Sequence, residues 1–274
     1  MENFLIALLI VIIIISVIYS YIKIDISYYE VKNNKIDKDI KILFLSDLHN
    51  RNIYNRLDII IDEEKPDIII CGGDMINEDI KYIDKFMKII PLFSNYKTYY
   101  VFGNHEERIK KDKPDHYKKY LSLLEKSNII LLNNKSKKIT NNIKIYGLDN
   151  NIDTYLNFGK KGLNKEIISN YLGNNKEEEF NILVAHNPLD FDSYVDSKYD
   201  LVLSGHIHGG LIIIPFFGGL LSPNYTFFPK YYKGLYKKNK TTMIVSRGLG
   251  FSARIKIRLF NNPEVVIINL KKGK

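Results

Sequence analysis

The chain has 274 residues, with 40 basic and 31 acidic side chains and a formal net charge of +9 at neutral pH. A hydrophobic fraction of 45% and a charged fraction of 26% are typical of a globular protein and exclude a disordered or collagen-like chain. The single cysteine excludes an intrachain disulfide framework and a cysteine-based zinc finger. The positive charge would suit nucleic acid, anionic lipid or phosphorylated substrates, but most of the excess is lysine spread along the whole chain, which we interpret as compositional bias.

Residues 4–22 contain no charged side chain and consist mainly of Ile, Leu and Val. At about 1.5 Å per residue, a helix over this segment spans roughly 28 Å, close to the thickness of the hydrocarbon core of a bilayer. The segment lacks the basic start and the small-residue cleavage site of a signal peptide. We therefore predict an uncleaved transmembrane anchor over residues 1–23, with Tyr19 and Tyr21 at the interface. A buried core helix is the alternative.

The lysines around this segment bear on its orientation. No Lys or Arg precedes the segment, whereas Lys23, Lys32, Lys35 and Lys38 follow it. By the positive-inside rule, this asymmetry indicates a single-pass protein of the cell membrane with its C-terminal part in the cytoplasm. Because lysine is frequent throughout the chain, an exported C-terminal part is the alternative.

Residues 24–274 show no Pro/Gly/Ser-rich linker, so we expect one domain. Short apolar runs alternate with longer amphipathic segments, a pattern that is typical of βαβ units and predicts an α/β fold. The predicted strands are 41–46, 67–71, 98–102, 143–148, 181–185 and 200–204, and the predicted helices are 54–64, 77–90 and 115–126. Two later apolar runs, 242–245 and 264–270, are predicted to extend a second sheet packed on the first.

Polar residues follow most of these strands at the point where each strand ends. The motifs are Asp47-Leu48-His49, Gly72-Gly73-Asp74, Gly103-Asn104-His105-Glu106, His186-Asn187 and Gly205-His206-Ile207-His208-Gly209-Gly210. Because ligands of open α/β sheets bind beyond the carboxyl ends of the strands, we expect these turns to converge on one crevice. The first and last motifs each carry two polar side chains two residues apart, a spacing that points both to the same side of an extended backbone.

Five of the six histidines lie in these turns, and only His116, interpreted as a surface residue, lies elsewhere. Imidazole, carboxylate and amide donors without thiolate suit Mn, Fe, Zn, Ni or Co at a catalytic site and argue against structural zinc. The donors exceed what one open ion needs. Two ions about 3.5–4 Å apart, bridged by one carboxylate, would use all of them.

The order of the motifs D-x-H, G-G-D, G-N-H-E, a single His and G-H-x-H-G-G over residues 41–210 resembles the calcineurin-like metallophosphoesterases. The tail sequences SRGLG at 246–250 and RLFNNPE at 258–264 resemble the membrane-associated bacterial branch that includes UDP-diacylglucosamine diphosphatases. The resemblance implies a four-layer α/β/β/α sandwich over residues 24–274, with two divalent metal ions at the strand ends. Manganese is the metal expected first, with Fe, Zn, Ni or Co as alternatives.

The resemblance also implies roles for individual residues. The implied ligands are Asp47, His49 and His208 for the first metal ion, Asn104, His186 and His206 for the second, and Asp74 as the bridge between them. A hydroxide held between the ions would attack phosphorus. His105 would be the catalytic histidine that protonates or stabilises the leaving oxygen.

Four other positions bear on the implied roles of the site residues. Glu106 and Asp149 are interpreted as carboxylates that support the site, with a direct chemical role as the alternative. Ile207 stands where threonine is usual in the branch, and Leu211 stands where glutamine is common. Neither residue is an implied ligand, so the two departures concern substrate preference rather than metal binding.

Two further segments leave alternatives open. Residues 211–236 (LIIIPFFGGLLSPNYTFFPKYYKGLY) are apolar and aromatic, and they would either cover a sheet edge as part of the core, which we expect, or form a loop near the bilayer for a lipid substrate. The basic stretch over 108–119 would either attract anionic substrate or lipid headgroups, or form a solvated helix face.

The leading hypothesis is a membrane-anchored, two-metal phosphoesterase that hydrolyses a phosphate ester or diphosphate in a lipid-linked or UDP-linked substrate. A nuclease or nucleotide phosphodiesterase on the same fold and an inactive membrane scaffold are the alternatives. The anchor argues against a nucleic-acid partner, and the intact ligand set argues against a scaffold. The expected partners are a phosphate-containing small molecule or lipid and the membrane; the sequence does not set the oligomeric state.

Overall fold

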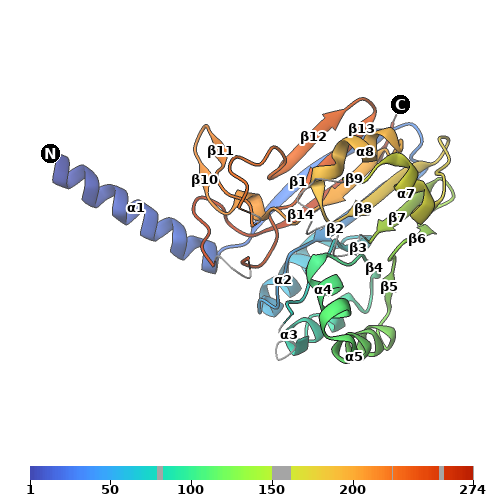
Figure 1. The fold of residues 1–274 in the computed structure, drawn as a ribbon, viewed down its shortest axis with the longest axis horizontal. Helices are drawn as coiled ribbons and strands as arrows, with labels where there is room; N and C mark the ends of the chain where they lie inside the picture. Colours follow the sequence, from blue (N-terminus) through green and yellow to red (C-terminus); the bar gives the residue numbers. More distant parts are fainter. Residues whose placement is uncertain (79–82, 150–161, 224, 253–255, 274) are drawn as a thin grey trace.

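The computed structural model describes residues 1–78, 83–149, 162–223, 225–252 and 256–273. Helix α1 (Glu2–Ile22) projects away from a domain that contains two β-sheets, each with helices on its outer face (Figure 1). Strand β1 begins at Asp25, directly after the helix, so the two parts are joined by a short connection.

The first sheet has six strands within the described residues, in the order β1-β14-β2-β3-β4-β5. They are β1 (Asp25–Asn33), β14 (Glu264–Lys272), β2 (Ile40–Leu45), β3 (Ile68–Cys71), β4 (Lys97–Tyr100) and β5 (Ile129–Leu131). Strands β2 to β5 run parallel, β14 is antiparallel to β2, and β1 is parallel to β14.

The second sheet also has six described strands, in the order β12-β13-β9-β8-β7-β6. They are β12 (Gly234–Lys238), β13 (Thr241–Val245), β9 (Leu201–Ser204), β8 (Phe180–Ala185), β7 (Ile143–Leu148) and β6 (Lys135–Lys138). The inner four strands are parallel, and the edge strands β12 and β6 pair antiparallel. A separate small hairpin consists of β10 (Ile213–Ile214) and β11 (Gly218–Gly219).

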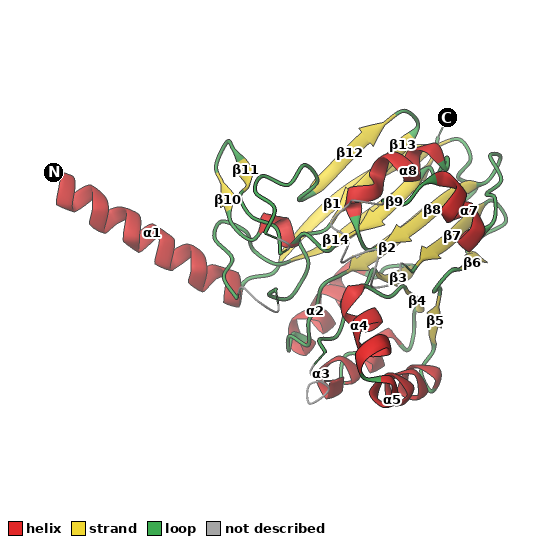
Figure 2. Ribbon diagram, in the orientation of Figure 1, coloured by secondary structure: helices red, strands yellow, loops and turns green. Residues whose placement is uncertain are grey.

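Short helices connect the strands. The α-helices of the domain are α2 (Tyr54–Glu64), α3 (Ile83–Met87), α4 (Asn104–Asp112), α5 (Pro114–Glu125), α7 (Lys165–Leu172) and α8 (Phe191–Asp196). The 3₁₀ helices are η2 (Ile90–Phe93), η3 (Pro188–Asp190) and η4 (His208–Gly210). Figure 2 shows α2 to α5 beside the first sheet and α7 and α8 over the second.

The side chains of each strand point alternately to the two faces of its sheet and so pack in two different layers. Ile42 and Phe44 of β2 pack against the second sheet, whereas Leu43 and Leu45 pack on the helix side, because successive side chains of a strand point to opposite faces. On the other side of the second sheet, Tyr146 packs with residues of α7 and α8. The order helix, sheet, sheet, helix confirms the predicted α/β/β/α fold.

Two sequence predictions about elements are wrong. Residues 264–270 do not extend the second sheet; β14 lies in the first sheet, where the unpredicted strand β1 pairs with it along nine residues. The helix predicted over 77–90 is too long, since α3 covers only Ile83–Met87 of its described residues. Asn77 does not begin a helix; its side chain is hydrogen-bonded to the ring of His49.

Helix α1 is, within the described residues, the one helix long and apolar enough to cross a membrane, a finding that rests on length and composition alone. Only 6% of its apolar stretch is buried in the protein, which contradicts the core-helix alternative. The C-terminal end of α1 is held by the domain: Arg51 donates from Nη2 to the carbonyl oxygen of Tyr21 at 2.6 Å.

We expect the fold to lose most stability when a side chain in the layer between the two sheets is shortened. Ile268 of β14 is fully buried between the sheets, whereas Ile59 of α2 is 57% exposed. We expect Ile268→Ala to lower the free energy of unfolding by about 2–5 kcal/mol because it leaves a cavity. The matched change Ile59→Ala is expected to shift it by about 0.5 kcal/mol or less. Urea unfolding of the full chain in detergent measures both, and equal losses would contradict the assigned layers.

Candidate metal centre

The loops that follow five strands meet at one end of the two sheets. Asp47 and His49 follow β2, Asp74 follows β3, Asn104 and His105 begin α4 after β4, His186 follows β8, and His206 and His208 follow β9. All eight are buried except Asn104, which is half-buried. The structure thus brings together every residue that the sequence analysis selected as a ligand or as the catalytic histidine. A cavity of about 250 Å³ is lined by six of the eight: His49, Asp74, Asn104, His105, His206 and His208.

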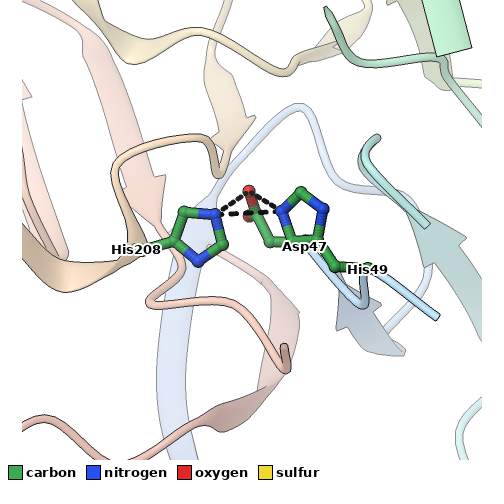
Figure 3. Close-up of side chains that lie close together, drawn as sticks. All are labelled: Asp47, His49 and His208. Atoms are coloured by element: carbon green, nitrogen blue, oxygen red, sulfur yellow. Dashed lines mark hydrogen bonds and ion pairs between the residues drawn. The ribbon is translucent and has the colours of Figure 1, made fainter. Parts of the chain in front are cut away.

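The first cluster consists of Asp47, His49 and His208 (Figure 3). The Nε2 atoms of the two histidines stand 3.0 Å apart, and Oδ1 of Asp47 lies 3.4 Å from Nε2 of His208 and 4.0 Å from Nε2 of His49. Two bonds of about 2.1 Å to one ion span at most about 4 Å, so these three atoms can share a metal ion.

The second cluster consists of Asp74, His186 and His206. Oδ2 of Asp74 lies 3.2 Å from Nε2 of His186. Asn104 adds an oxygen, Oδ1, that is buried and has no hydrogen-bond partner among the described residues. An unmatched buried acceptor beside carboxylate and imidazole donors fits a cation better than it fits an empty site.

Asp74 also connects the two clusters. Its Oδ2 lies 3.9 Å from Nε2 of both His49 and His105, and these three residues form a third group with metal-ligand spacing. The donor chemistry therefore fits two ions that share Asp74. The assignment of each residue to one ion, and of His105 to catalysis, stays a prediction.

The backbone of the site differs from the extended form assumed in the sequence analysis. Five predicted ligands have a positive φ angle: Asp47 (50°), His49 (47°), Asp74 (53°), His206 (71°) and His208 (52°). Residues other than glycine rarely adopt this region, and each such residue costs about 1–3 kcal/mol. The paired side chains converge because of these tight turns and not because of strand alternation. Such strain is typical of functional sites.

Burial and neighbouring charges set the protonation of the cluster. Burial, with a smaller contribution from His105, lowers the pKa of His49 to about 4, and burial with His186 lowers the pKa of His206 to about 3. Both rings are therefore neutral near pH 7, the form in which imidazole binds metal ions. Burial alone would lower the pKa of His186, but Asp74 and Asp47 outweigh it and raise that pKa to about 10.

The two carboxylates respond differently to their surroundings. Burial would raise the pKa of Asp74, but His186 and His105 outweigh it and hold that pKa well below its ordinary value. Burial raises the pKa of Asp47 in spite of His186. The backbone N–H of His206 donates to both oxygens of Asp47 at 3.1 Å and orients the carboxylate.

Neighbouring acceptors fix the orientation of two rings. Nδ1–H of His49 donates to Oδ1 of Asn77 at 2.6 Å, and Nδ1–H of His186 donates to the carbonyl oxygen of Gly72 at 2.7 Å. Both acceptors lack a proton, so Nε2 of each ring is left for the cluster. The sequence analysis missed Asn77, because only the fold brings it to His49.

Glu106 supports the loop that carries Asp74. Its carboxylate accepts hydrogen bonds from the backbone N–H groups of Asp74 (3.0 Å), Met75 (2.9 Å) and Gly103 (2.9 Å), and from the hydroxyl of Tyr100 (2.6 Å). Burial raises the pKa of Glu106 to about 7, although Tyr100 and Gly103 act in the opposite direction. These bonds favour the supporting role over a direct chemical one.

Asp149 lies outside the three groups with metal-ligand spacing. Its backbone N–H donates to Oδ1 of Asn134 at 3.0 Å, and burial together with Glu107 raises its pKa well above the ordinary value. Of the basic stretch over 108–119, Arg108 lines the metal cavity and pairs with Glu78, whereas Lys110 and Lys118 pair with acidic residues on their own helices. A solvated helix face therefore describes most of this stretch, with Arg108 as the exception.

The tail sequences noted in the sequence analysis pack behind the first cluster. Arg258 is fully buried, donates to the carbonyl oxygens of Arg247 (2.7 Å) and Gly250 (2.6 Å), and places Nη2 3.2 Å from Nδ1 of His208. Asn261 donates to the carbonyl oxygen of His208 at 2.7 Å. The tail therefore holds the loop of His208 in place, a role that the sequence motif alone did not reveal.

The fold and the clustered donors define the class of protein. Residues 40–210 match the family model described as calcineurin-like phosphoesterase, and the chain belongs to this family. An uncharacterized metallophosphoesterase of Helicobacter pylori is 32% identical over 249 residues, which cover 86% of this chain and 61% of that protein. The phosphodiesterase YaeI of Escherichia coli is 29% identical over 241 residues, which cover 84% of this chain and 82% of that protein.

A solved structure shares the fold with a TM-score of 0.51 at 14% identity, covering 76% of this chain and 90% of that chain. The chain spans about three fifths, 61%, of the length of the Helicobacter relative.

Asn77 predicts a measurable effect on metal affinity. We expect Asn77→Ala to weaken Mn²⁺ binding by about 10–100-fold, because the ring of His49 loses the acceptor that orients it. Asn128→Ala is the matched control, since Asn128 is exposed and lines a different cavity. Calorimetric titration of the metal-stripped full chain measures both. Unchanged affinity in Asn77→Ala would show that Asn77 does not position His49.

Proposed function

We propose that the chain is a membrane-anchored metal-dependent phosphoesterase that uses two divalent ions. The observation that carries this proposal is the pair of buried donor clusters that Asp74 connects. Asp47, His49 and His208 would hold one ion, and Asn104, His186 and His206 would hold the other. We propose manganese first, because carboxylate, amide and imidazole donors without thiolate suit it.

When bound, the ions would supply a nucleophilic water near neutral pH and neutralise charge on the phosphoryl oxygens. The chain itself fixes the donors: Glu106 holds the loop of Asp74, and Arg258 and Asn261 hold the loop of His208. Residues that are locked before substrate arrives need no rearrangement during the reaction, which is the condition for effective electrostatic catalysis.

His105 is proposed as the catalytic acid. It lines the cavity, and its Nδ1 lies 3.3 Å from Oε1 of Glu78. From this position on the cavity wall, the ring can pass a proton to the leaving oxygen of the substrate. Arg108 pairs with the same carboxylate of Glu78 and keeps it in place.

The substrate proposal combines the site with the helix. We propose that residues 1–23 are the anchor, that residues 24–274 are the catalytic domain, and that the substrate is a phosphate ester or diphosphate linked to a lipid or to UDP. Support comes from the exposed apolar surface of α1 and from the tail sequences that resemble the UDP-diacylglucosamine diphosphatase branch. The lysines after α1 favour a cytoplasmic domain at the cell membrane.

The first test is metal-dependent hydrolysis by the full chain in detergent. We expect cleavage of a chromogenic phosphodiester or monoester that requires added Mn²⁺, and a loss on the order of 1,000-fold in Asp74→Asn, since several kcal/mol of charge stabilisation depend on the ions. Asp115→Asn, at an exposed position of α5, is the matched control and keeps full activity. If the folded chain binds metal but cleaves neither ester, a UDP-linked lipid is the next substrate to test. A folded chain that binds no metal contradicts the proposal.

The role of His105 has its own test. We expect His105→Gln to lower kcat by about 100–10,000-fold for esters with a poor leaving group and far less for a nitrophenyl ester, which needs little protonation. The exposed His116 provides the control His116→Gln, which leaves kcat unchanged for both esters. Metal content measured in parallel separates the two possible roles: loss of metal in His105→Gln would make His105 a ligand instead of the acid.

A further inference from the structure

Six large apolar side chains stand exposed on the segments beside the metal cavity. This apolar rim consists of Phe216 (104% exposed), Phe217 (77%), Phe227 (67%), Phe228 (56%), Ile257 (50%) and Phe260 (42%). The first four belong to the stretch 211–236 that the sequence analysis assigned to the core, and for them that expectation is wrong. Soluble surfaces rarely gather aromatic rings in this way unless they meet a membrane or another protein.

The backbone of the rim adds an independent observation. Phe216, Phe228 and Phe260 have positive φ angles of 70°, 48° and 51°. A bulky residue in this region is a strained outlier, and a strained backbone persists where the structure uses it. The three rings at these positions are exposed, so burial in the domain accounts for little of Phe216 and only part of Phe228 and Phe260. Contact with an apolar environment outside the domain would bury the exposed ring surface.

The rim is continuous with helix α1. The backbone N–H of Phe260 donates to Oγ of Ser16 at 2.7 Å, and the hydroxyl of Tyr21 donates to the carbonyl oxygen of Lys256 at 2.7 Å. Ser16 lies more than one turn before the end of α1, so Phe260 lies alongside the apolar helix and not beyond it. If α1 crosses the bilayer, Phe260 reaches into the same leaflet.

The hairpin that carries Phe216 and Phe217 is tied to this contact. The backbone N–H of Ile213 donates to the carbonyl oxygen of Leu259 at 2.9 Å, which joins β10 to the segment of Phe260. Figure 1 shows β10 and β11 at the end of the molecule from which α1 projects. The same segments reach the metal site, because Pro223 and Ser252 line its cavity.

Charge on this side of the molecule suits lipid headgroups. Arg51, Arg56 and Lys88 line a cavity of about 530 Å³ beside Tyr21, and no acidic residue is among the described residues that line it. Basic side chains next to the interfacial end of a membrane helix attract anionic headgroups. Basic residues at the interface and aromatic rings beyond it are the pattern of a surface that lies in the headgroup region.

We propose that the apolar rim inserts into the bilayer leaflet that holds the C-terminal end of α1, so that the metal cavity opens at the level of the lipid headgroups. The occupant of the rim is the lipid surface itself. The inference rests on the proposed anchoring by α1, but it is independent of catalysis and of the bound metal.

The absence of tryptophan from the chain makes a direct test possible. Phe217→Trp in the full chain places the single tryptophan on the rim, and Tyr171→Trp, at a 42% exposed position of α7, is the matched control. Each variant is reconstituted into phosphatidylcholine–phosphatidylglycerol vesicles with either ordinary or acyl-brominated lipid. We expect bromine to reduce the emission of Phe217→Trp roughly two-fold and to leave the control unchanged, since interfacial side chains enter the headgroup and acyl boundary.

The outcomes separate this inference from the proposed function. In one outcome, the chain floats with the vesicles while Phe217→Trp and a second variant, Phe227→Trp, show equal emission with both lipids. This result contradicts insertion of the rim and leaves anchoring intact. A chain that does not float overturns both anchoring and the rim. Quenching in a folded chain that binds no metal supports the rim and contradicts the proposed function alone.

Discussion

The carboxylate of Asp74 has to stay between imidazoles that come from separate loops, and much of the structure serves that constraint. Its Oδ1 accepts the backbone N–H of His105 at 2.9 Å, and its own N–H donates to Glu106 at 3.0 Å. A side chain at position 103 would collide with Asp74, so glycine is required there. The loops after β3 and β4 are thereby locked to each other, and the other loops close around them.

This arrangement is unfavourable without a cation. The buried rings of His49, His186 and His208 each have Nε2 within 4.0 Å of a carboxylate oxygen of Asp47 or Asp74. Five residues of the site also have strained backbone angles. Burial of polar donors and backbone strain both reduce stability. A ligand that binds only the folded chain adds stability by mass action, so ions bound at these clusters would couple metal binding to folding. We therefore expect the metal-free chain to have a lower free energy of unfolding than the metal-bound chain.

The sequence predicted the parts of the fold that depend on local patterns. Buried parallel strands such as β3 and β9 are short and mostly apolar runs, and the glycine-flanked motifs at their ends identified residues of the site. Strand β1 was missed because most of its residues are only partly buried and its partner, β14, lies at the far end of the chain. Asn77 and the exposed rings of Phe216 and Phe217 were also missed, because contact with His49 and exposure to solvent are properties of the tertiary structure.

The central claim is that the two clusters hold two ions bridged by Asp74. Crystals of the full chain soaked in Mn²⁺ and measured at a wavelength where manganese scatters anomalously test it most directly. We predict two anomalous peaks about 3.5–4 Å apart, one beside His49 and His208 and one beside His186 and His206, with Asp74 between them. A single peak, or none in a folded chain, would contradict the account.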